Sequence, residues 1–547
     1  MAVNGARSLV RTLTELGVDA AFGLPGAHSL PIWDALADSE LGGIRLVGVR
    51  HEQAAAHAAD GYSRAVGSLG VALVTTGPGA VNTLRAVGEA RASASPVLVI
   101  ATDVPSTPRA AGTGRGSAQE IDCQERLFEP LTKAAFTVEQ PTEIAAVVRR
   151  AAEIAMRPQS GPVYVGIPAD FLGEPVMEQP EPAGPVVPGP PSVASEDVER
   201  AREALVEARR PLIWVGGGAL RSGAGEAIGG LAERLAAPII TTFAARGIVP
   251  PDHPCLASNP VHAPEVGALW DEADVVLAVG TDFDGTMTQN GRMPQPPGLI
   301  AVNIDAEDAA KNYPPDLLLL GDAREVVEEL SLGISPKPGL DELTRRLDEI
   351  EVRVRRRVRK EEPHAAEFLS ALKETLPEGS VLVSDMCVAG YWIGGFHRVS
   401  GPRQLALPTG WGTVGFGFPA ALGVAAAGAV RAVCVTGDGG FLPGCAELAT
   451  AIQEKLPVTV VIVDDGGYGM LRYDQAHAGF EHHGVDLVTP DFVGLAKSFG
   501  VYADRVDGFG RAFRRLLREF TRSDEPNVLV VSAELRPPLN TSSRWYR

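Results

Sequence analysis

The sequence is poor in cysteine and in positive charge, and each shortage excludes a class of protein. Its five cysteines are scattered and odd in number, which argues against a disulfide scaffold and favours a reduced, cytoplasmic setting. The formal net charge of −19 argues against nucleic-acid binding. No apolar run reaches the roughly 18 residues that a membrane span needs, and the N-terminus lacks the apolar segment of a secretory signal. We therefore expect no membrane association.

What the sequence does contain is a repeated alternation of apolar strand-like runs with helical patterns. This alternation predicts parallel sheets covered by helices. We predict an α/β fold of three doubly wound parallel-sheet domains, at residues 1–180, 190–335 and 363–540. Residues 177–195 are too rich in proline and glycine for a helix or a central strand, so we assign a linker there. Residues 341–362 predict one charged connecting helix that ends before Pro363.

Residues 437–469 carry the strongest sign of a ligand site. A GDGG turn containing Asp438 follows one apolar run, and a DDGG turn containing Asp465 follows the next, 27 residues later. Such turns lie at the carboxyl edge of a parallel sheet, where ligands bind, and glycines with a helix N-terminus suit a phosphate. Carboxylates beside a phosphate need a hard cation such as Mg²⁺ between them. A bare pair of strand-to-helix turns is the structural alternative, which the second turn makes less favourable.

The whole stretch resembles the diphosphate-binding motif of thiamine diphosphate enzymes, which begins Gly-Asp-Gly and ends in Asn-Asn. The sequence departs from that motif because Asp464 and Asp465 replace the two asparagines and add negative charge beside the diphosphate. The resemblance implies that thiamine diphosphate and Mg²⁺ are bound here. It implies metal ligation by Asp438, Asp465 and the carbonyl of Gly467, and cofactor contacts from Gly439, Gly440, Gly469 and Met470.

Glu52 is the first catalytic candidate. It lies in the segment VRHEQAAAHAADGYSRAVG at residues 49–67, where a glutamate in the first turn of a helix could simply complement the helix dipole. The segment resembles the RHEQ…ADGYAR segment of the same family, however. The resemblance implies that Glu52 hydrogen-bonds N1′ of the cofactor aminopyrimidine and assists proton removal from C2 of the thiazolium.

Two further loops and one glutamine of the first domain resemble family motifs. TTGPGAVN at residues 75–82 is similar to the TSGPGATN loop, which implies that Thr75, Pro78 and Asn82 line the pyrimidine pocket. FGLPGAH at residues 22–28 is similar to the FGxPG loop, which implies that Pro25 contacts the cofactor and that His28 faces the substrate, as the similar Gly-Ala-His of benzaldehyde lyase suggests. His28 could instead cap its own turn. The resemblance also places Gln119 beside the reacting carbon.

Two segments of the third domain complete the resemblance. GWGTVGFGFP at residues 410–419 is similar to GxGTMGFGxP of the family. This implies that the Gly412 carbonyl accepts from the 4′-amino group and that Val414 wedges the cofactor into a bent form. SDMCVA at residues 384–389 aligns with a segment that contacts the diphosphate, where Cys387 and Val388 offer backbone N–H donors.

The resemblance, strongest to acetohydroxyacid synthase (acetolactate synthase), implies decarboxylation and carboligation of 2-oxo acids. Three features of that enzyme are missing. The segment that carries its substrate-binding arginine is replaced by GTDFDGT at residues 280–286. Ala169 replaces its lysine, and Asp474 replaces the tryptophan that selects the acceptor. Loss of the arginine removes a bidentate carboxylate contact. These departures leave the substrate undefined and make FAD, which acetohydroxyacid synthase carries in its middle domain, doubtful.

In the family, Glu52 and the third-domain motif would meet across a subunit interface, so a homodimer is the minimum assembly and a homotetramer is expected. Two alternatives remain open within the family: a hydroxyketone lyase and ligase of the benzaldehyde lyase type, and a non-catalytic paralogue that binds thiamine diphosphate. The triple glycine at residues 216–218 could suggest a nicotinamide site. It lacks the G-x-G-x-x-G spacing, so a structural turn is favoured.

Overall fold

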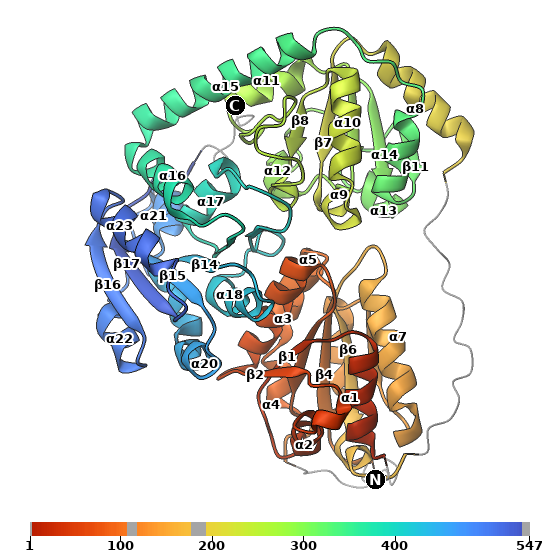
Figure 1. Ribbon diagram of the computed structural model, residues 1–547, viewed down its shortest axis with the longest axis vertical. Coiled ribbons are helices and arrows are strands. Elements are labelled where there is room, and N and C mark those ends of the chain that lie inside the picture. The colour runs from red at the N-terminus through yellow and green to blue at the C-terminus, as the bar shows by residue number, and fades with distance from the viewer. Residues whose placement is uncertain (1–2, 107–117, 177–192, 539–547) are drawn as a thin grey trace.

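The computed structural model describes residues 3–106, 118–176 and 193–538, which form three parallel β-sheets covered by helices (Figure 1). The predicted α/β class is confirmed, and every strand pair in the three sheets is parallel. Most of the predicted linker at residues 177–195 lies outside the described part of the chain. Within the described part, no helix is long and apolar enough to cross a membrane.

The first sheet has six strands in the order β2-β1-β3-β4-β6-β5. Its strands are β1 (Ala20–Gly23), β2 (Arg45–Gly48), β3 (Gly70–Val74), β4 (Val97–Asp103), β5 (Ala134–Thr137) and β6 (Val163–Pro168). Its helices are α1 (Gly5–Glu15), α2 (Leu30–Leu36), α3 (Glu52–Val66), α4 (Pro78–Val81), α5 (Leu84–Ala92) and α7 (Ile144–Met156). Because α3 and α4 follow β2 and β3 directly, Glu52 and the 75–82 loop lie at one edge of this sheet.

The middle sheet has five strands in the order β11-β10-β9-β7-β8. Its strands are β7 (Pro211–Val215), β8 (Ile239–Thr241), β9 (Val275–Val279), β10 (Leu299–Asn303) and β11 (Leu317–Leu320). Its helices are α8 (Ser195–Glu207), α9 (Gly217–Ser222), α10 (Gly225–Leu235), α11 (Pro264–Glu272), α12 (Gly285–Thr288), α13 (Ala306–Ala310) and α14 (Ala323–Ser331). The long helix α15 (Leu340–Glu361) then crosses to the third sheet and ends just before Pro363, as predicted (Figure 1).

The third sheet has six strands in the order β13-β12-β14-β15-β17-β16. Its strands are β12 (Val381–Ser384), β13 (Leu405–Ala406), β14 (Ala432–Gly437), β15 (Val458–Asp464), β16 (Tyr502–Asp507) and β17 (Asn527–Ser532). Its helices are α16 (Pro363–Thr375), α17 (Val388–Phe396), α18 (Gly417–Ala426), α19 (Asp438–Phe441), α20 (Leu448–Gln453), α21 (Gly469–His477), α22 (Phe492–Ser498) and α23 (Arg511–Phe520).

Each sheet is buried on both faces, which explains why its central strands are apolar without interruption. In β14, Ala432 and Cys434 pack into a core shared with the first sheet, whereas Val433 and Val435 pack into a core shared with the middle sheet. Successive side chains of a strand point to opposite faces, so one strand contributes to both cores. The third sheet thus packs against both other sheets.

Two helices from different sheets cross at very close range. A methyl group on Gly61 of α3 would lie 2.1 Å from the carbonyl oxygen of Ala420, and one on Gly423 of α18 would lie 1.8 Å from that of Ala58. Only glycine permits this backbone approach at the two positions. The crossing joins the helix that begins at Glu52 to the helix that follows the 410–417 loop.

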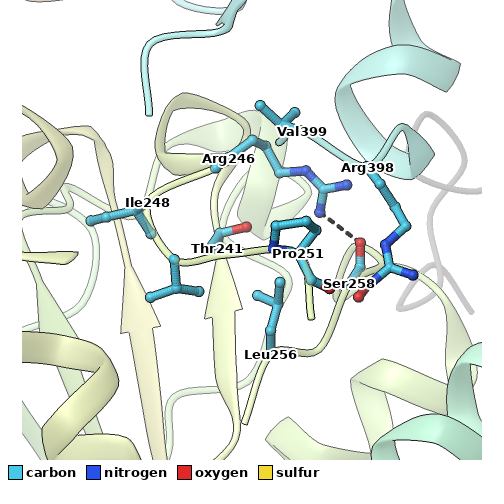
Figure 2. A pocket seen from close by; sticks show the side chains of 10 residues that line it. Thr241, Arg246, Ile248, Pro251, Leu256, Ser258, Arg398 and Val399 are labelled. Carbon is cyan, nitrogen blue, oxygen red and sulfur yellow. Dashed lines mark hydrogen bonds between the residues drawn. The ribbon is translucent and has the colours of Figure 1, made fainter. Parts of the chain in front are cut away.

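Two arginines, the buried Arg246 and the partly buried Arg398, join the middle domain to the third (Figure 2). Arg246 donates 2.8 Å hydrogen bonds to the carbonyls of Ser258 and His397, and Arg398 donates to the carbonyl of Pro251. Burial, and then the neighbouring Arg398, lower the pKa of Arg246 to about 10. The pocket between them has about 20 Å³, room for roughly one water. Each arginine donates a hydrogen bond to a main-chain carbonyl of the other domain, so the two side chains hold the middle and third domains together.

Candidate active site

Three neighbouring strands of the third sheet, β12, β14 and β15, end at one edge, and the predicted diphosphate residues follow them. Cys387 precedes α17, Asp438 begins α19, and Asp465 follows β15 directly. A methyl group on Gly437 would lie 3.4 Å from Cβ of Cys387, and one on Gly469 would lie 3.7 Å from Cγ2 of Val388. The three segments therefore converge, as the sequence predicts for this edge.

Asp438 is the most deeply buried acid at this edge, with 1% of its surface exposed. Its Oδ1 accepts a 2.7 Å hydrogen bond from the Gly439 N–H. Its buried Oδ2 has no hydrogen-bond partner within the described residues. Burial, and also the neighbouring Asp464, raise its pKa, against the Gly439 hydrogen bond. A buried acceptor without a donor costs free energy unless a ligand satisfies it, so Oδ2 fits a bound cation.

Asp465 lies on the adjacent turn. Its Oδ1 accepts a 2.9 Å hydrogen bond from Nη2 of Arg472, which also donates to the Asp465 carbonyl at 2.8 Å. Burial, and next the carboxylate of Asp438, raise the pKa of Asp465 to about 6, while Arg472 opposes this shift. A methyl group on Gly469 would lie 2.4 Å from Oδ2, so a side chain at that position would displace the Asp465 carboxylate. Because Gly437 pairs with Val463 in the β14–β15 ladder, the acids that follow these two strands lie at the same place on the sheet edge.

The second turn is held by the segment that follows α21. Gly467 pairs with Asp486 in an antiparallel bridge, and a methyl group on Gly467 would lie 2.2 Å from the Val485 carbonyl. Tyr468 covers the first turn, since a methyl group on Gly439 would lie 2.6 Å from its Cε1. Met470 is partly buried against the core shared by the middle and third sheets. These contacts fix the turn that carries Asp465.

No group of three or more His, Cys, Asp or Glu side chains in the described ranges is arranged to hold a metal. The predicted set has only two carboxylates, Asp438 and Asp465, together with a main-chain carbonyl at Gly467. Mg²⁺ commonly takes one or two carboxylates and completes its shell with phosphate oxygens and water. The residues present therefore fit a metal that is bound together with a diphosphate.

Asp385 is a residue that the sequence reasoning missed. Its buried carboxylate accepts hydrogen bonds from the N–H groups of Met386 at 2.7 Å, Gly415 at 2.8 Å and Gly417 at 3.0 Å. Burial raises its pKa to about 6 and outweighs these hydrogen bonds. Asp385 thus holds the 410–417 loop, where Gly412 has a φ of +73° that favours glycine. The sequence signals were its place directly after a strand and its place in the SDMCVA segment at residues 384–389, from which only Cys387 and Val388 were selected as cofactor contacts.

Val414 lies in that loop and is partly exposed, with its carbonyl accepting from Nη2 of Arg85. Gly440 of the first turn approaches the same acid, because a methyl group there would lie 3.2 Å from Cγ of Asp385. The loop and the GDGG turn therefore lie side by side.

Glu52 is the first residue of α3 and is 8% exposed. Its Oε2 accepts a 2.9 Å hydrogen bond from Nδ2 of Asn82, and a methyl group on Gly79 would lie 3.4 Å from its Oε1. Thr75 packs against both Gly79 and Gly26. The structure thus brings together Glu52, Thr75 and Asn82, and with them the adjacent Pro25 and Pro78.

His28 does more than cap its own turn. Its Nδ1 lies 2.7 Å from Oγ1 of Thr76, which in turn lies 2.9 Å from Oγ1 of Thr102. This hydroxyl chain orients the imidazole toward the 75–82 loop. The side chain is partly buried, so its remaining surface can meet a ligand.

Gln119 is exposed and has a φ of +69°. A methyl group on Gly77 would lie 2.3 Å from the Gln119 carbonyl, so its backbone lies against the 75–82 loop. The buried Gln124, which sequence reasoning missed, accepts from the Gly77 N–H at 2.6 Å and donates to the Thr102 carbonyl at 3.0 Å. Nothing in the local pattern of the sequence singled it out.

The first and third sheets also meet through Glu447. Its buried carboxylate accepts from the N–H of Arg50 at 3.0 Å and of His51 at 3.1 Å. These two residues immediately precede Glu52. Within the described residues, however, no hydrogen bond joins Glu52 or Asn82 to the third sheet. Within one chain, the third domain thus holds the backbone just before Glu52 but makes no hydrogen bond to the Glu52 carboxylate in the described residues.

The middle sheet offers little sign of a cofactor site at its glycines. A methyl group on Gly216 would lie 2.3 Å from the Gly280 carbonyl, which agrees with a structural turn at residues 216–218. Phe283 is 1% exposed and stacks on Trp214 with ring centroids 5.7 Å apart. The side chain of Phe283 therefore belongs to the core of this domain.

Comparisons with known proteins agree with this arrangement. Family models match all three parts: the thiamine pyrophosphate enzyme N-terminal TPP binding domain at residues 3–126, the central domain at 198–330 and the C-terminal TPP binding domain at 385–531. A probable acetolactate synthase large subunit of Methanocaldococcus jannaschii is 35% identical, covering 99% of this chain and 94% of its own length. A probable 2-ketoarginine decarboxylase of Pseudomonas aeruginosa is also 35% identical, covering 91% and 88%.

A solved structure has the same fold. The thiamine diphosphate-dependent 4-hydroxybenzoylformate decarboxylase of Rhodococcus jostii RHA1 superposes with a TM-score of 0.82 at 22% identity, covering 98% of this chain and 100% of its own. Together with the family models and the curated relatives, the two sheet edges described above place the chain in a known group: it belongs to the thiamine pyrophosphate enzyme family.

Proposed function

We propose that the protein is a thiamine diphosphate- and Mg²⁺-dependent lyase and ligase that decarboxylates 2-oxo acids and joins the product to a carbonyl acceptor. The observation that carries the proposal is the buried Oδ2 of Asp438, which has no partner in the described chain and lies beside the Asp465 turn. Two relatives support the substrate class, because their names denote decarboxylases of 2-ketoarginine and 4-hydroxybenzoylformate, both 2-oxo acids.

In this proposal, Asp438, Asp465 and the carbonyl of Gly467 hold Mg²⁺. When bound, thiamine diphosphate supplies a nucleophilic carbon and an electron sink for breaking a bond next to a carbonyl. The residues proposed to hold it are Pro25, Glu52, Thr75, Pro78, Asn82, Cys387, Val388, Gly412, Val414, Asp438, Gly439, Gly440, Asp465, Gly467, Gly469 and Met470. The first five come from the first domain and the rest from the third, so both domains contribute to holding the cofactor.

Glu52 is the proposed proton-transfer residue. The hydrogen bond from Asn82 to Oε2 fixes the carboxyl group and leaves Oε1 to exchange a proton with a ring nitrogen. His28 and Gln119 are the proposed substrate contacts. Thr76 holds the His28 ring through Nδ1 and leaves Nε2 for the substrate; when Nε2 carries a proton, it donates to a carboxylate or carbonyl oxygen.

The assembly proposed is a homodimer at least, and a homotetramer by analogy with the family. Its support in this chain is that Glu52 has its hydrogen bond within its own domain, while the metal-binding turns belong to another. A second copy would supply the complementary half of each site. FAD stays doubtful, and the absorption spectrum of the purified protein would show any bound flavin.

The test is a panel of pyruvate, phenylpyruvate, benzoylformate and benzoin, assayed with and without thiamine diphosphate and Mg²⁺. Glu52→Gln should reduce turnover by roughly 10²- to 10⁴-fold, because it removes the proton-transfer group. Glu129→Gln, an exposed site in the same domain, is the matched control. Full activity of Glu52→Gln would remove Glu52 from the mechanism, and cofactor binding without turnover on any substrate would favour the non-catalytic alternative.

A hydroxyketone lyase of the benzaldehyde lyase type is the second candidate. The observation in its favour is His28, whose link to Thr76 aims the ring at the 75–82 loop. Turnover of benzoin without turnover of the 2-oxo acids would establish this alternative.

A further inference from the structure

Three acids and two arginines meet where β14 and β15 end. The acids are Asp438, Asp464 and Asp465. Arg472 lies 2.9 Å from Oδ1 of Asp465, and Arg505 lies 2.9 Å from Oδ2 of Asp464. The paired side chains of Arg472 and Asp465 are 19% and 12% exposed, so solvent screens this pair only partly.

Two of the three acids at this edge are paired with arginines. Three carboxylates alone would place three negative charges beside an anionic diphosphate. One divalent cation would only partly offset the repulsion between the carboxylates and the diphosphate. Arg472 pairs with Asp465 and Arg505 with Asp464. Of the three acids, Asp438 has no arginine partner within the described residues, and it is also the acid whose Oδ2 lacks a hydrogen-bond partner there.

Arg472 also fixes the shape of the second turn. Its Nη2 donates to both the side chain and the carbonyl of Asp465, and a methyl group on Gly467 would lie 2.9 Å from the same nitrogen. Its Nε lies 3.5 Å from Oδ1 of Asp486 on the facing segment. The guanidinium thus occupies Oδ1 of Asp465 and leaves Oδ2 beside Gly469 for another ligand.

We propose that Arg472 is a positioning residue and internal counter-ion of the metal and diphosphate site. By holding Oδ1, it presents Oδ2 of Asp465 to the metal and cancels the charge that an aspartate brings to this turn. Arg505 cancels the charge of Asp464 in the same way but does not contact the turn at residues 465–467. This inference rests on the proposed function, since it assumes that a divalent cation and a diphosphate bind here.

The test is a double-mutant cycle read by calorimetric titration, without any assay of turnover. Thiamine diphosphate is titrated into wild type, Arg472→Gln, Asp465→Asn and the double variant at fixed Mg²⁺. Arg472→Gln should weaken binding by roughly tenfold or more, because it leaves a carboxylate uncompensated. The double variant should recover to within about threefold of wild type, because its turn is neutral again.

Arg515→Gln, which breaks an exposed Arg515–Glu519 pair, is the matched control and should bind as wild type does. Arg472→Lys should keep the charge and bind more tightly than Arg472→Gln. Unchanged binding in Arg472→Gln would overturn the inference, and a double variant as weak as Arg472→Gln would overturn the charge role. Failure of the wild-type protein to bind would overturn the proposed function and this inference with it, so the two failures are distinguishable.

Discussion

Acid should destabilise this protein through one buried histidine, His57 of α3. The side chain is fully buried, and within the described residues neither ring nitrogen has a hydrogen-bond partner. The ring lies edge-on to Phe416 of the third domain, with centroids 5.5 Å apart. Burial lowers the pKa of His57 to about 3, with smaller contributions of the same sign from Arg85 and Arg64 and an opposing one from Asp60.

The sign and size of the effect follow from linkage. The unfolded chain takes up a proton at His57 near pH 6.5, whereas the folded chain does so only near pH 3. The contribution of His57 to the free energy of unfolding is therefore complete above pH 6.5 and is lost as pH falls from 6.5 toward 3. At pH 5, which is about 1.5 pH units below the pKa of unfolded His57, protonation favours the unfolded state by about 1.4 kcal/mol per pH unit, so the free energy of unfolding falls by about 2 kcal/mol.

The assay compares guanidinium unfolding of wild type and His57→Leu at pH 7.5 and pH 5. Leucine is close to histidine in volume and does not titrate, so the variant should lose about 2 kcal/mol less than wild type on acidification. The buried His397, whose pKa burial lowers to about 4, is common to both proteins and cancels in the comparison. His482→Gln, at an exposed site, should follow wild type. Equal losses in wild type and His57→Leu would refute the reasoning.

Two further substitutions test the site and the domain contact. Asp438→Asn should stabilise the cofactor-free protein by about 1–3 kcal/mol, because it removes a buried charge. The same substitution should abolish Mg²⁺-dependent cofactor binding. Thermal unfolding with and without cofactor measures both effects. Gly423→Ala should lower the free energy of unfolding by about 3 kcal/mol or more, because its methyl group would lie 1.8 Å from the Ala58 carbonyl oxygen. A melting temperature equal to that of wild type would contradict the tight crossing of α3 and α18.

The sequence was most informative where strands are buried on both faces. The strands β3 (Gly70–Val74), β7 (Pro211–Val215) and β9 (Val275–Val279) are unbroken or nearly unbroken apolar runs in the sequence. Fully buried parallel strands need unbroken apolar sequence, so their pattern is visible locally. Short strands such as β8 (Ile239–Thr241) and β13 (Leu405–Ala406) have no such signal, because two or three residues carry no readable period.

The same limit applies to the site. Asp438 and Asp465 could be placed at one sheet edge because each directly follows a strand. Their long-range partners could not be placed: Arg505 reaches Asp464 across 41 positions, and Asp385 reaches Gly417 across 32. Such contacts depend on how distant elements pack, which no local pattern encodes. The extra negative charge of Asp464 and Asp465 therefore looked uncompensated until the two arginine partners were seen.

Whether one chain or two make each site can be decided by complementation. The crossing of α3 and α18, together with Glu447, ties Glu52 firmly to its own third domain. Glu52 nevertheless has no hydrogen bond to that domain in the described chain, and we propose that Asp438 of a second copy completes its site. If each site combines Glu52 of one chain with Asp438 of another, Glu52→Gln and Asp438→Asn chains should rescue each other.

In a mixed dimer of the two variants, one site receives both substitutions and the other receives neither. Unfolding and refolding the two inactive variants together at equal amounts should make half of the dimers mixed, so about a quarter of wild-type activity should return. Each variant refolded alone is the control and should stay inactive. If the mixture also stays inactive while refolded wild type regains activity, Glu52 and Asp438 act within one chain, and the shared site is wrong.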